Sequence, residues 1–149
     1  APDNLFYPLA LIDLDVSRQQ LSKAAQRLEQ ALQAHPSSYP LRAARADLLG
    51  RQEKFREAEI QLEQLLKERP GDPDLWYELA EIRGQTNNII GLHQARAEFF
   101  ARVGDYDQAI EQLGHAKQRA SNNYPLAARI DARQLELVNE EKAIKDMLK

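Results

Sequence analysis

The chain has 149 residues, of which 43% are hydrophobic and 29% are charged, and its formal net charge is −3. This length suits one domain with a buried core, and the slightly acidic balance argues against nucleic acid as a partner. Without any cysteine, the chain cannot form disulfides, thiolate metal sites or a cysteine nucleophile. No apolar run approaches the roughly 20 residues that span a bilayer, so we expect no direct insertion into a membrane. Because the sequence opens on Ala1 rather than methionine, we expect a processed chain or an excised fragment.

Helical periodicity and helix-end signals predict eight or nine helices. The expected ranges are 7–16, 20–35, 40–52, 54–68, 73–85, 89–103, 105–119 and 124–138, followed by a short helix over 140–148. The first range has a competing interpretation, because apolar residues from Ala10 to Val16 also alternate as they would in a strand. Asp72 and Pro73 are typical of a helix start. The final segment, 139–149, is expected to cap the exposed end of the last helix pair.

Equivalent residues recur 34 positions apart in the first half of the chain. The pairs are Ala24 and Ala58, Leu28 and Leu62, Leu32 and Leu66, and Pro36 and Pro70. This is the period of the tetratricopeptide repeat, in which two antiparallel helices cross at a small residue. The chain therefore resembles a tetratricopeptide repeat domain, which implies an all-α superhelix in a single domain over 1–149.

The repeat register shifts near residues 86–104. Phe55 and Tyr106 each open a second helix of a pair, yet the interval between them is one and a half repeats instead of a whole number. The helix expected over 89–103 follows a first helix and also precedes a second one. We infer that this helix is shared between two overlapping repeats.

Catalytic and metal-binding motifs are missing from the sequence. His35, His93 and His115 are neither at helix-neighbour spacing nor part of a His-Glu-x-x-His motif. Where tetratricopeptide repeats often have tryptophan this chain has His93, so we expect that side chain to fill space. No glycine-rich phosphate loop and no serine in a nucleophile context are present. We therefore predict no enzyme activity and no cofactor for this chain.

An acidic residue recurs at the ninth position of successive first helices. The series consists of Asp13, Asp47, Glu81, Glu98 and Asp131. In the tetratricopeptide family this position faces the concave groove. When the family's groove positions are carried over to this sequence, the expected protein-binding neighbours of the acidic series are Arg51, Tyr77, Gln85, Gln94 and Arg102. The groove lacks the cluster of Lys, Arg and Asn with which some members hold the carboxylate tails of cytosolic chaperones, so that clamp is not expected.

Two roles for the acidic series stay open. In the first, the carboxylates accept hydrogen bonds from the backbone N–H groups or the basic side chains of a partner protein. In the second, each acid pairs with a nearby arginine and only ties helices together, and the candidate arginines are Arg45, Arg96 and Arg129.

A closer resemblance rests on four segments of the second half. These are Asp74–Glu81, Gly91–Phe100, Gly104–Leu113 and Ala128–Arg133. They resemble the C-terminal repeat domain of the BepA (YfgC) group of bacterial periplasmic metalloproteases, which are of the M48 type. The resemblance implies a parent protein with an N-terminal zinc protease domain. Zinc is then expected only in that domain, whose His-Glu-x-x-His motif is missing here.

The same resemblance implies a periplasmic location and a chaperone-like role in the assembly and quality control of outer-membrane proteins. The repeat domain would dock on the barrel-assembly machinery, on substrate barrel proteins and on its own protease domain. The alternative is a stand-alone tetratricopeptide scaffold that binds a different protein partner.

Overall fold

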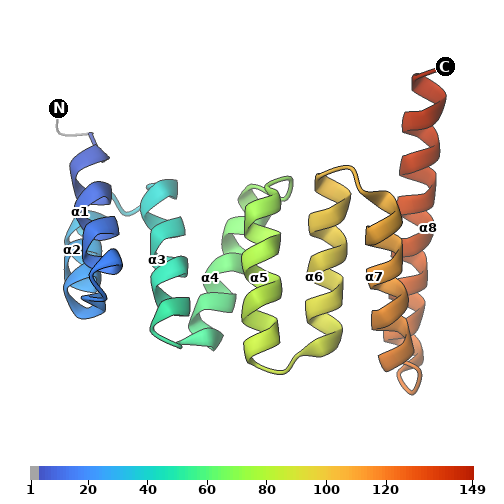
Figure 1. Ribbon diagram of the computed structural model, residues 1–149, viewed down its shortest axis with the longest axis horizontal. Coiled ribbons are helices and arrows are strands. Elements are labelled where there is room, and N and C mark those ends of the chain that lie inside the picture. Colours follow the sequence, from blue (N-terminus) through green and yellow to red (C-terminus); the bar gives the residue numbers. More distant parts are fainter. Residues whose placement is uncertain (1–3) are drawn as a thin grey trace. The chain divides into compact units, whose positions relative to one another are not determined.

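The computed structural model describes residues 4–149, and within this range it holds eight α-helices and no strand (Figure 1). The helices are α1 (Phe6–Ser17), α2 (Leu21–Ala34), α3 (Tyr39–Arg51), α4 (Phe55–Glu68), α5 (Pro73–Gln85), α6 (Ile89–Arg102), α7 (Tyr106–Arg119) and α8 (Tyr124–Met147). The all-α prediction is confirmed, and the strand alternative for the first element is wrong. Ile12 and Asp15 are both buried in α1, and their three-residue spacing is helical rather than alternating.

Side-chain caps and prolines explain where three of the helices begin. Ser38, Asp72 and Asn123 precede α3, α5 and α8, and each accepts a hydrogen bond from a backbone N–H of the first turn. A proline occupies the first or second position of the same three helices. Because proline has no N–H to lose there and its φ already suits a helix, this arrangement favours helix initiation. The predicted start at Asp72 and Pro73 is confirmed.

One type of turn ends α1, α3, α5 and α6. In each turn a residue with positive φ is followed by a backbone N–H that bonds a carbonyl five residues earlier. The positive-φ residues are Gln19, Glu53, Asn87 and Gly104. The first three follow one another at intervals of one full repeat, and the last interval is half a repeat. Helix α6 therefore ends as first helices do, although it directly follows another first helix.

Gly104 allows a test of this turn. Its φ of +84° lies in the left-handed region, so alanine there is strained even though no atom would meet the added Cβ within 4 Å. Gly104→Ala is expected to lower the free energy of unfolding by about 1 kcal/mol. The control is Gly71→Ala, where φ is not positive and space is also open. Chemical denaturation followed by circular dichroism checks both variants, and equal stability of the two would contradict the expectation.

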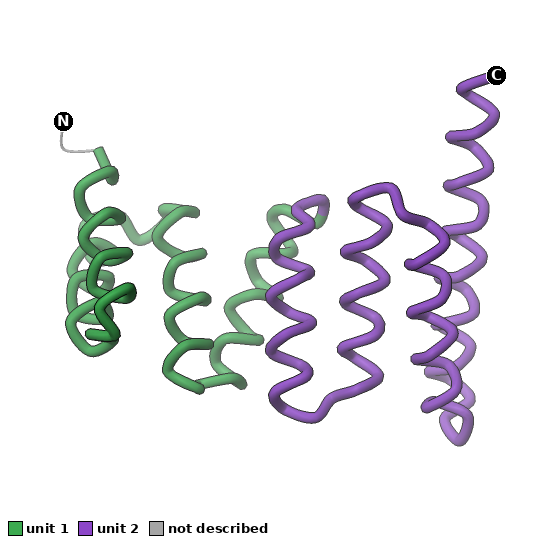
Figure 2. Tube along the Cα trace, in the orientation of Figure 1, with its two compact units in different colours: residues 1–70 green, residues 71–149 purple. Residues whose placement is uncertain are grey.

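The chain divides into two compact units, residues 1–70 and 71–149 (Figure 2). In the first unit α1 packs on α2, α2 on α3, and α3 on α4. Its core includes Ile12, Leu28 and Leu41, and the small residue Ala24 is fully buried beside them. Alanine at such a position lets two helix backbones approach closely. A single repeat domain over the whole chain stays a prediction, because neighbouring parts of one array can form separate compact units.

The second unit stacks α5 on α6, α6 on α7, and α7 on α8. Its core is rich in alanine where α6 and α7 meet, with Ala97, Ala109 and Ala116 fully buried. Larger side chains fill the space toward α8, namely Leu113, Ile130 and Leu137. This unit holds the pocket described below.

Helix α8 is longer than the sequence predicted. The separate helix expected over 140–148 is wrong, because α8 continues without a break from Tyr124 to Met147. Residues 138–142 contain neither glycine nor proline, so nothing in this stretch ends the helix. At 1.5 Å per residue α8 is about 36 Å long and α7 about 21 Å, and the last turns of α8 extend past α7 (Figure 1). No helix among the described residues is long and apolar enough to cross a membrane.

Candidate functional site

Glu98 on α6 is the centre of an ion network in the second unit. Its two carboxylate oxygens accept hydrogen bonds from Arg133 on α8, with Nε–Oε1 at 2.8 Å and Nη2–Oε2 at 3.0 Å. Arg102, one turn later on α6, also donates to Glu98. The Glu98 side chain is only 16% exposed, so these bonds are shielded from water. The network joins α6 directly to α8, two helices further along the chain.

Arg133 contacts two further carboxylates on its own helix. Its Nη1 donates to Glu136 at 2.7 Å and to Glu140 at 3.4 Å. The hydrogen bond to Glu98 is the main reason that the pKa of Arg133 is raised above its ordinary value. Burial acts in the opposite direction but is outweighed. Arg133 is therefore a fixed cation whose hydrogen-bonding capacity is largely used within the chain.

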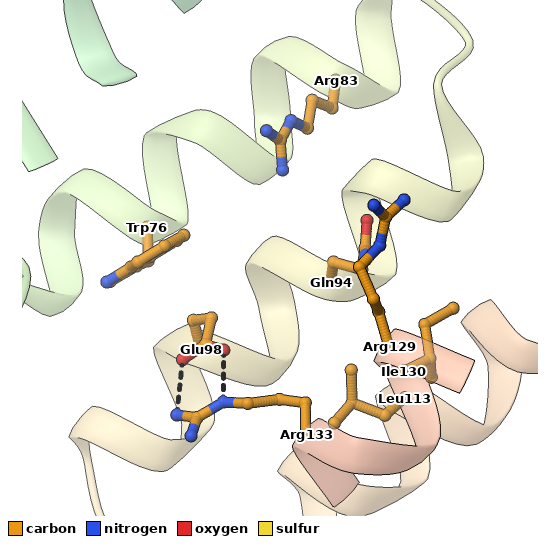
Figure 3. Close-up of a pocket in the computed structure, with 8 residues that line it drawn as sticks. All are labelled: Trp76, Arg83, Gln94, Glu98, Leu113, Arg129, Ile130 and Arg133. Carbon is orange, nitrogen blue, oxygen red and sulfur yellow. Dashed lines mark hydrogen bonds and ion pairs between the residues drawn. The ribbon is translucent and has the colours of Figure 1, made fainter. Parts of the chain in front are cut away.

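A pocket of about 230 Å³ lies beside this network (Figure 3). It is lined by Trp76 and Arg83 of α5, Gln94 and Glu98 of α6, Leu113 of α7, and Arg129, Ile130 and Arg133 of α8. Leu113 and Ile130 are almost fully buried and supply an apolar wall. The guanidinium carbon of Arg102 lies 5.2 Å from the centre of the Trp76 ring, a cation–π contact that holds the indole in place. Four helices thus converge on one small hollow.

Some polar side chains of this pocket form hydrogen bonds within the chain and others do not. Arg83 donates to the carbonyl of Gly91 at 3.1 Å, and Arg133 is held by Glu98. In contrast, neither Arg129 nor Gln94 forms a hydrogen bond or ion pair with any residue of 4–149. Their polar groups are therefore available to something outside the described chain.

The structure brings together only some of the ten residues that the sequence selected. Gln94 and Glu98 line the pocket, and Arg102 supports it. Tyr77 is 55% exposed and contacts Phe99 edge to face, with ring centres 5.6 Å apart. Asp13, Glu81 and Gln85 are exposed and form no ion pair or side-chain hydrogen bond within the described chain.

The remaining selected residues form ion pairs. Asp47 accepts from Arg51 at 2.9 Å on the same helix, and Asp131 pairs with Lys117 at 2.7 Å across α7 and α8. None of the arginines proposed as helix ties contacts the acidic series, and Arg45 instead lies 3.7 Å from Glu29. Glu98 and Asp131 therefore do join helices to one another through ion pairs, as one of the two predicted roles required, but the partners named from the sequence are wrong. Residues on a helix surface pair three or four positions apart or across a helix contact, which repeat position alone does not encode.

Sequence reasoning missed two ion pairs of the first unit. Asp15 is only 3% exposed and accepts from Arg27 Nε at 2.7 Å, which ties α1 to α2. Arg42 on α3 donates from Nη1 to Glu68 Oε1 at 3.0 Å and from Nη2 to Glu68 Oε2 at 2.5 Å, which ties α3 to α4. The signal for Asp15 was its position three residues after Ile12, on the buried face of α1.

The histidines lie closer together than their sequence spacing suggested. His93 on α6 and His115 on α7 have ring centres 5.3 Å apart, because α6 packs against α7. His93 Nδ1 also lies 2.8 Å from Gln112 Oε1. Even so, residues 4–149 contain no group of three or more histidine, aspartate or glutamate side chains placed to hold a metal ion. The prediction that His93 fills packing space fits its half-buried position.

Residues 16–82 match the family model of the tetratricopeptide repeat. The chain contains a tetratricopeptide repeat region. The match runs from the end of α1 almost to the end of α5, so it includes the segment in which the sequence recurs with the tetratricopeptide period. With eight helices and no strand over the described range, the fold class is the α–α solenoid of tetratricopeptide type. Tetratricopeptide repeats generally mediate contacts between proteins.

Proposed function

We propose that the chain is the interaction module of a periplasmic protease-chaperone that acts in the assembly and quality control of outer-membrane proteins. The observation that carries the binding role is the pocket of the second unit, where the polar groups of Gln94 and Arg129 have no partner within the described residues. The periplasmic role is supported by the four segments of the second half that resemble the BepA group.

In this proposal the chain binds the partner proteins, and the protease domain of the parent protein carries out the catalysis. The partners are the barrel-assembly machinery, substrate barrel proteins and the protein's own protease domain, which would hold the zinc. Glu98 is not the acceptor for a partner, because Arg102 and Arg133 already occupy its carboxylate. Asp13 and Glu81 remain open acceptors of the acidic series.

A second candidate is a stand-alone tetratricopeptide scaffold with another protein partner. The observation in its favour is that the matched family model describes the repeat alone and covers residues 16–82. This candidate uses the same surface and differs in compartment and partner.

Site-specific photo-crosslinking tests the proposal. A crosslinking amino acid is placed at Gln94, in the pocket, or at Gln108, which is exposed on α7 and does not line the pocket. We expect components of the barrel-assembly machinery to crosslink at position 94 and not at position 108 when the chain is present in the bacterial periplasm. Equal crosslinking at both positions, or none of these components at position 94, would count against the proposal.

A further inference from the structure

We infer that the pocket in the second unit binds a carboxylate of a protein partner through Arg129 and Gln94. This inference rests on one part of the proposed function, namely that the partner is a protein. It does not depend on the periplasmic role. The sequence suggested Arg129 only as a possible partner of the acidic series within the chain, and that series pointed to a basic partner protein instead.

The charge of the lining favours an anion. Three of the eight lining side chains are arginines, and Glu98 is the only carboxylate among them. Arg133 takes both oxygens of Glu98, so this carboxylate cannot also neutralise Arg129. Arg133 is compensated by Glu98, Glu136 and Glu140. Arg129 has no carboxylate partner among residues 4–149, so an incoming carboxylate would pair with Arg129.

The shape and polarity of the pocket favour a carboxylate on a short apolar stem. Arg129 presents a planar set of N–H donors that matches the two oxygens of a carboxylate, and Gln94, which lines the same pocket, carries an amide group that can also donate (Figure 3). Leu113, Ile130 and the Trp76 ring form apolar walls against which the stem of the carboxylate can pack. A volume of about 230 Å³ accommodates an aspartate or glutamate side chain, or a C-terminal carboxylate.

The chain provides its own probe for this site. Trp76 is the only tryptophan of the sequence and it lines the pocket, so tryptophan fluorescence reports on pocket occupancy. The ligands are three peptides with the same short apolar sequence. One carries an aspartate side chain and an amidated C-terminus, the second carries asparagine and a free C-terminal carboxylate, and the third carries asparagine and an amidated C-terminus. The first two distinguish the two sources of the carboxylate.

We expect a saturable change of fluorescence with at least one carboxylate peptide and none with the third peptide. Arg129→Ala is expected to weaken the binding about tenfold or more, since hydrogen bonds to charged groups contribute about 1.5–3 kcal/mol. Arg96→Ala is the matched control, because Arg96 is an exposed arginine on α6 without an ion pair in residues 4–149 and does not line the pocket. It should bind as the unchanged chain does. Arg129 is exposed and unpartnered, so its loss should not affect folding, which circular dichroism verifies.

Charge reversal gives a second, independent readout. Arg129→Glu should no longer bind the carboxylate peptides and should instead bind a peptide in which lysine replaces the aspartate. Equal responses to all three original peptides, no response to any of them, or unchanged affinity in Arg129→Ala would overturn the inference. Even then, crosslinking of the assembly machinery at position 94 would still support the proposed function. Carboxylate binding without crosslinks to the assembly machinery would instead retain the pocket and reject the periplasmic role.

Discussion

Replacing Leu137 by alanine is expected to destabilise the second unit by about 2–5 kcal/mol, the range for removing a large buried aliphatic side chain. Leu137 has no exposed surface and belongs to the core that α8 shares with α6 and α7. Because α8 is the last helix of the stack and has α7 as its main packing partner, the cavity weakens the main contact that holds α8 in place. Urea denaturation followed by Trp76 fluorescence measures the loss in this unit.

The matched control is Leu135→Ala, two residues away on the same helix. Leu135 is 62% exposed, so removing its side chain leaves no cavity and should change the free energy of unfolding by less than about 0.5 kcal/mol. A loss at Leu135 comparable to that at Leu137 would contradict the packing of α8 described above.

Glu98→Gln is expected to lower the free energy of unfolding by about 1.5–3 kcal/mol, the range for hydrogen bonds to charged groups. The substitution keeps the shape of the side chain but removes the charge that Arg102 and Arg133 share. Breaking a fully buried pair by removing one partner costs about 3–5 kcal/mol. The expected cost is smaller here, because the side chains of Glu98 and Arg133 are 16% and 24% exposed and water still reaches part of them.

Asp47→Asn serves as the control for Glu98→Gln. Asp47 and Arg51 form an ion pair one helical turn apart, but their side chains are 44% and 54% exposed, so loss of the pair should cost less than about 1 kcal/mol. Urea denaturation measures the free energy of unfolding of both variants. If both lose the same amount, the expectation that the Glu98 network is shielded from water is wrong. Since Glu98→Gln also frees Arg133 beside the pocket, the same variant should bind a carboxylate peptide more tightly while it is less stable.

The helices could be predicted from the sequence because each is specified locally. Apolar residues at helical spacing, prolines at helix starts and the repeat period placed both ends of seven helices, and the start of the eighth, to within a few residues. The error at α8 also has a local cause. Buried residues become sparse after Leu137, and this weaker pattern suggested a break although no residue there ends a helix.

The site was harder to predict because it depends on pairings between distant residues. Glu98 and Arg133 are far apart in the sequence and meet only because α8 packs beside α7. The repeat position of Glu98 suggested an acid open to a partner, whereas the structure shows that arginines surround it. Arg129 could be recognised as the unengaged cation only after the partners of every other charge in the pocket were known.

The matching turns at Asn87 and Gly104 make the chain modular at this point. Removing residues 87–103 would join α5 directly to Gly104 and α7, with Gly104 taking over the left-handed position of Asn87. Phe55 and Tyr106 would then be separated by one full repeat, and the array would become regular. The excised piece carries Gln94 and Glu98, so the shortened chain would keep its helical pairs and lose the hollow between α5 and α8. The additional half-repeat is therefore what distinguishes this chain from a plain array, and it supplies part of the surface that we propose recognises a partner.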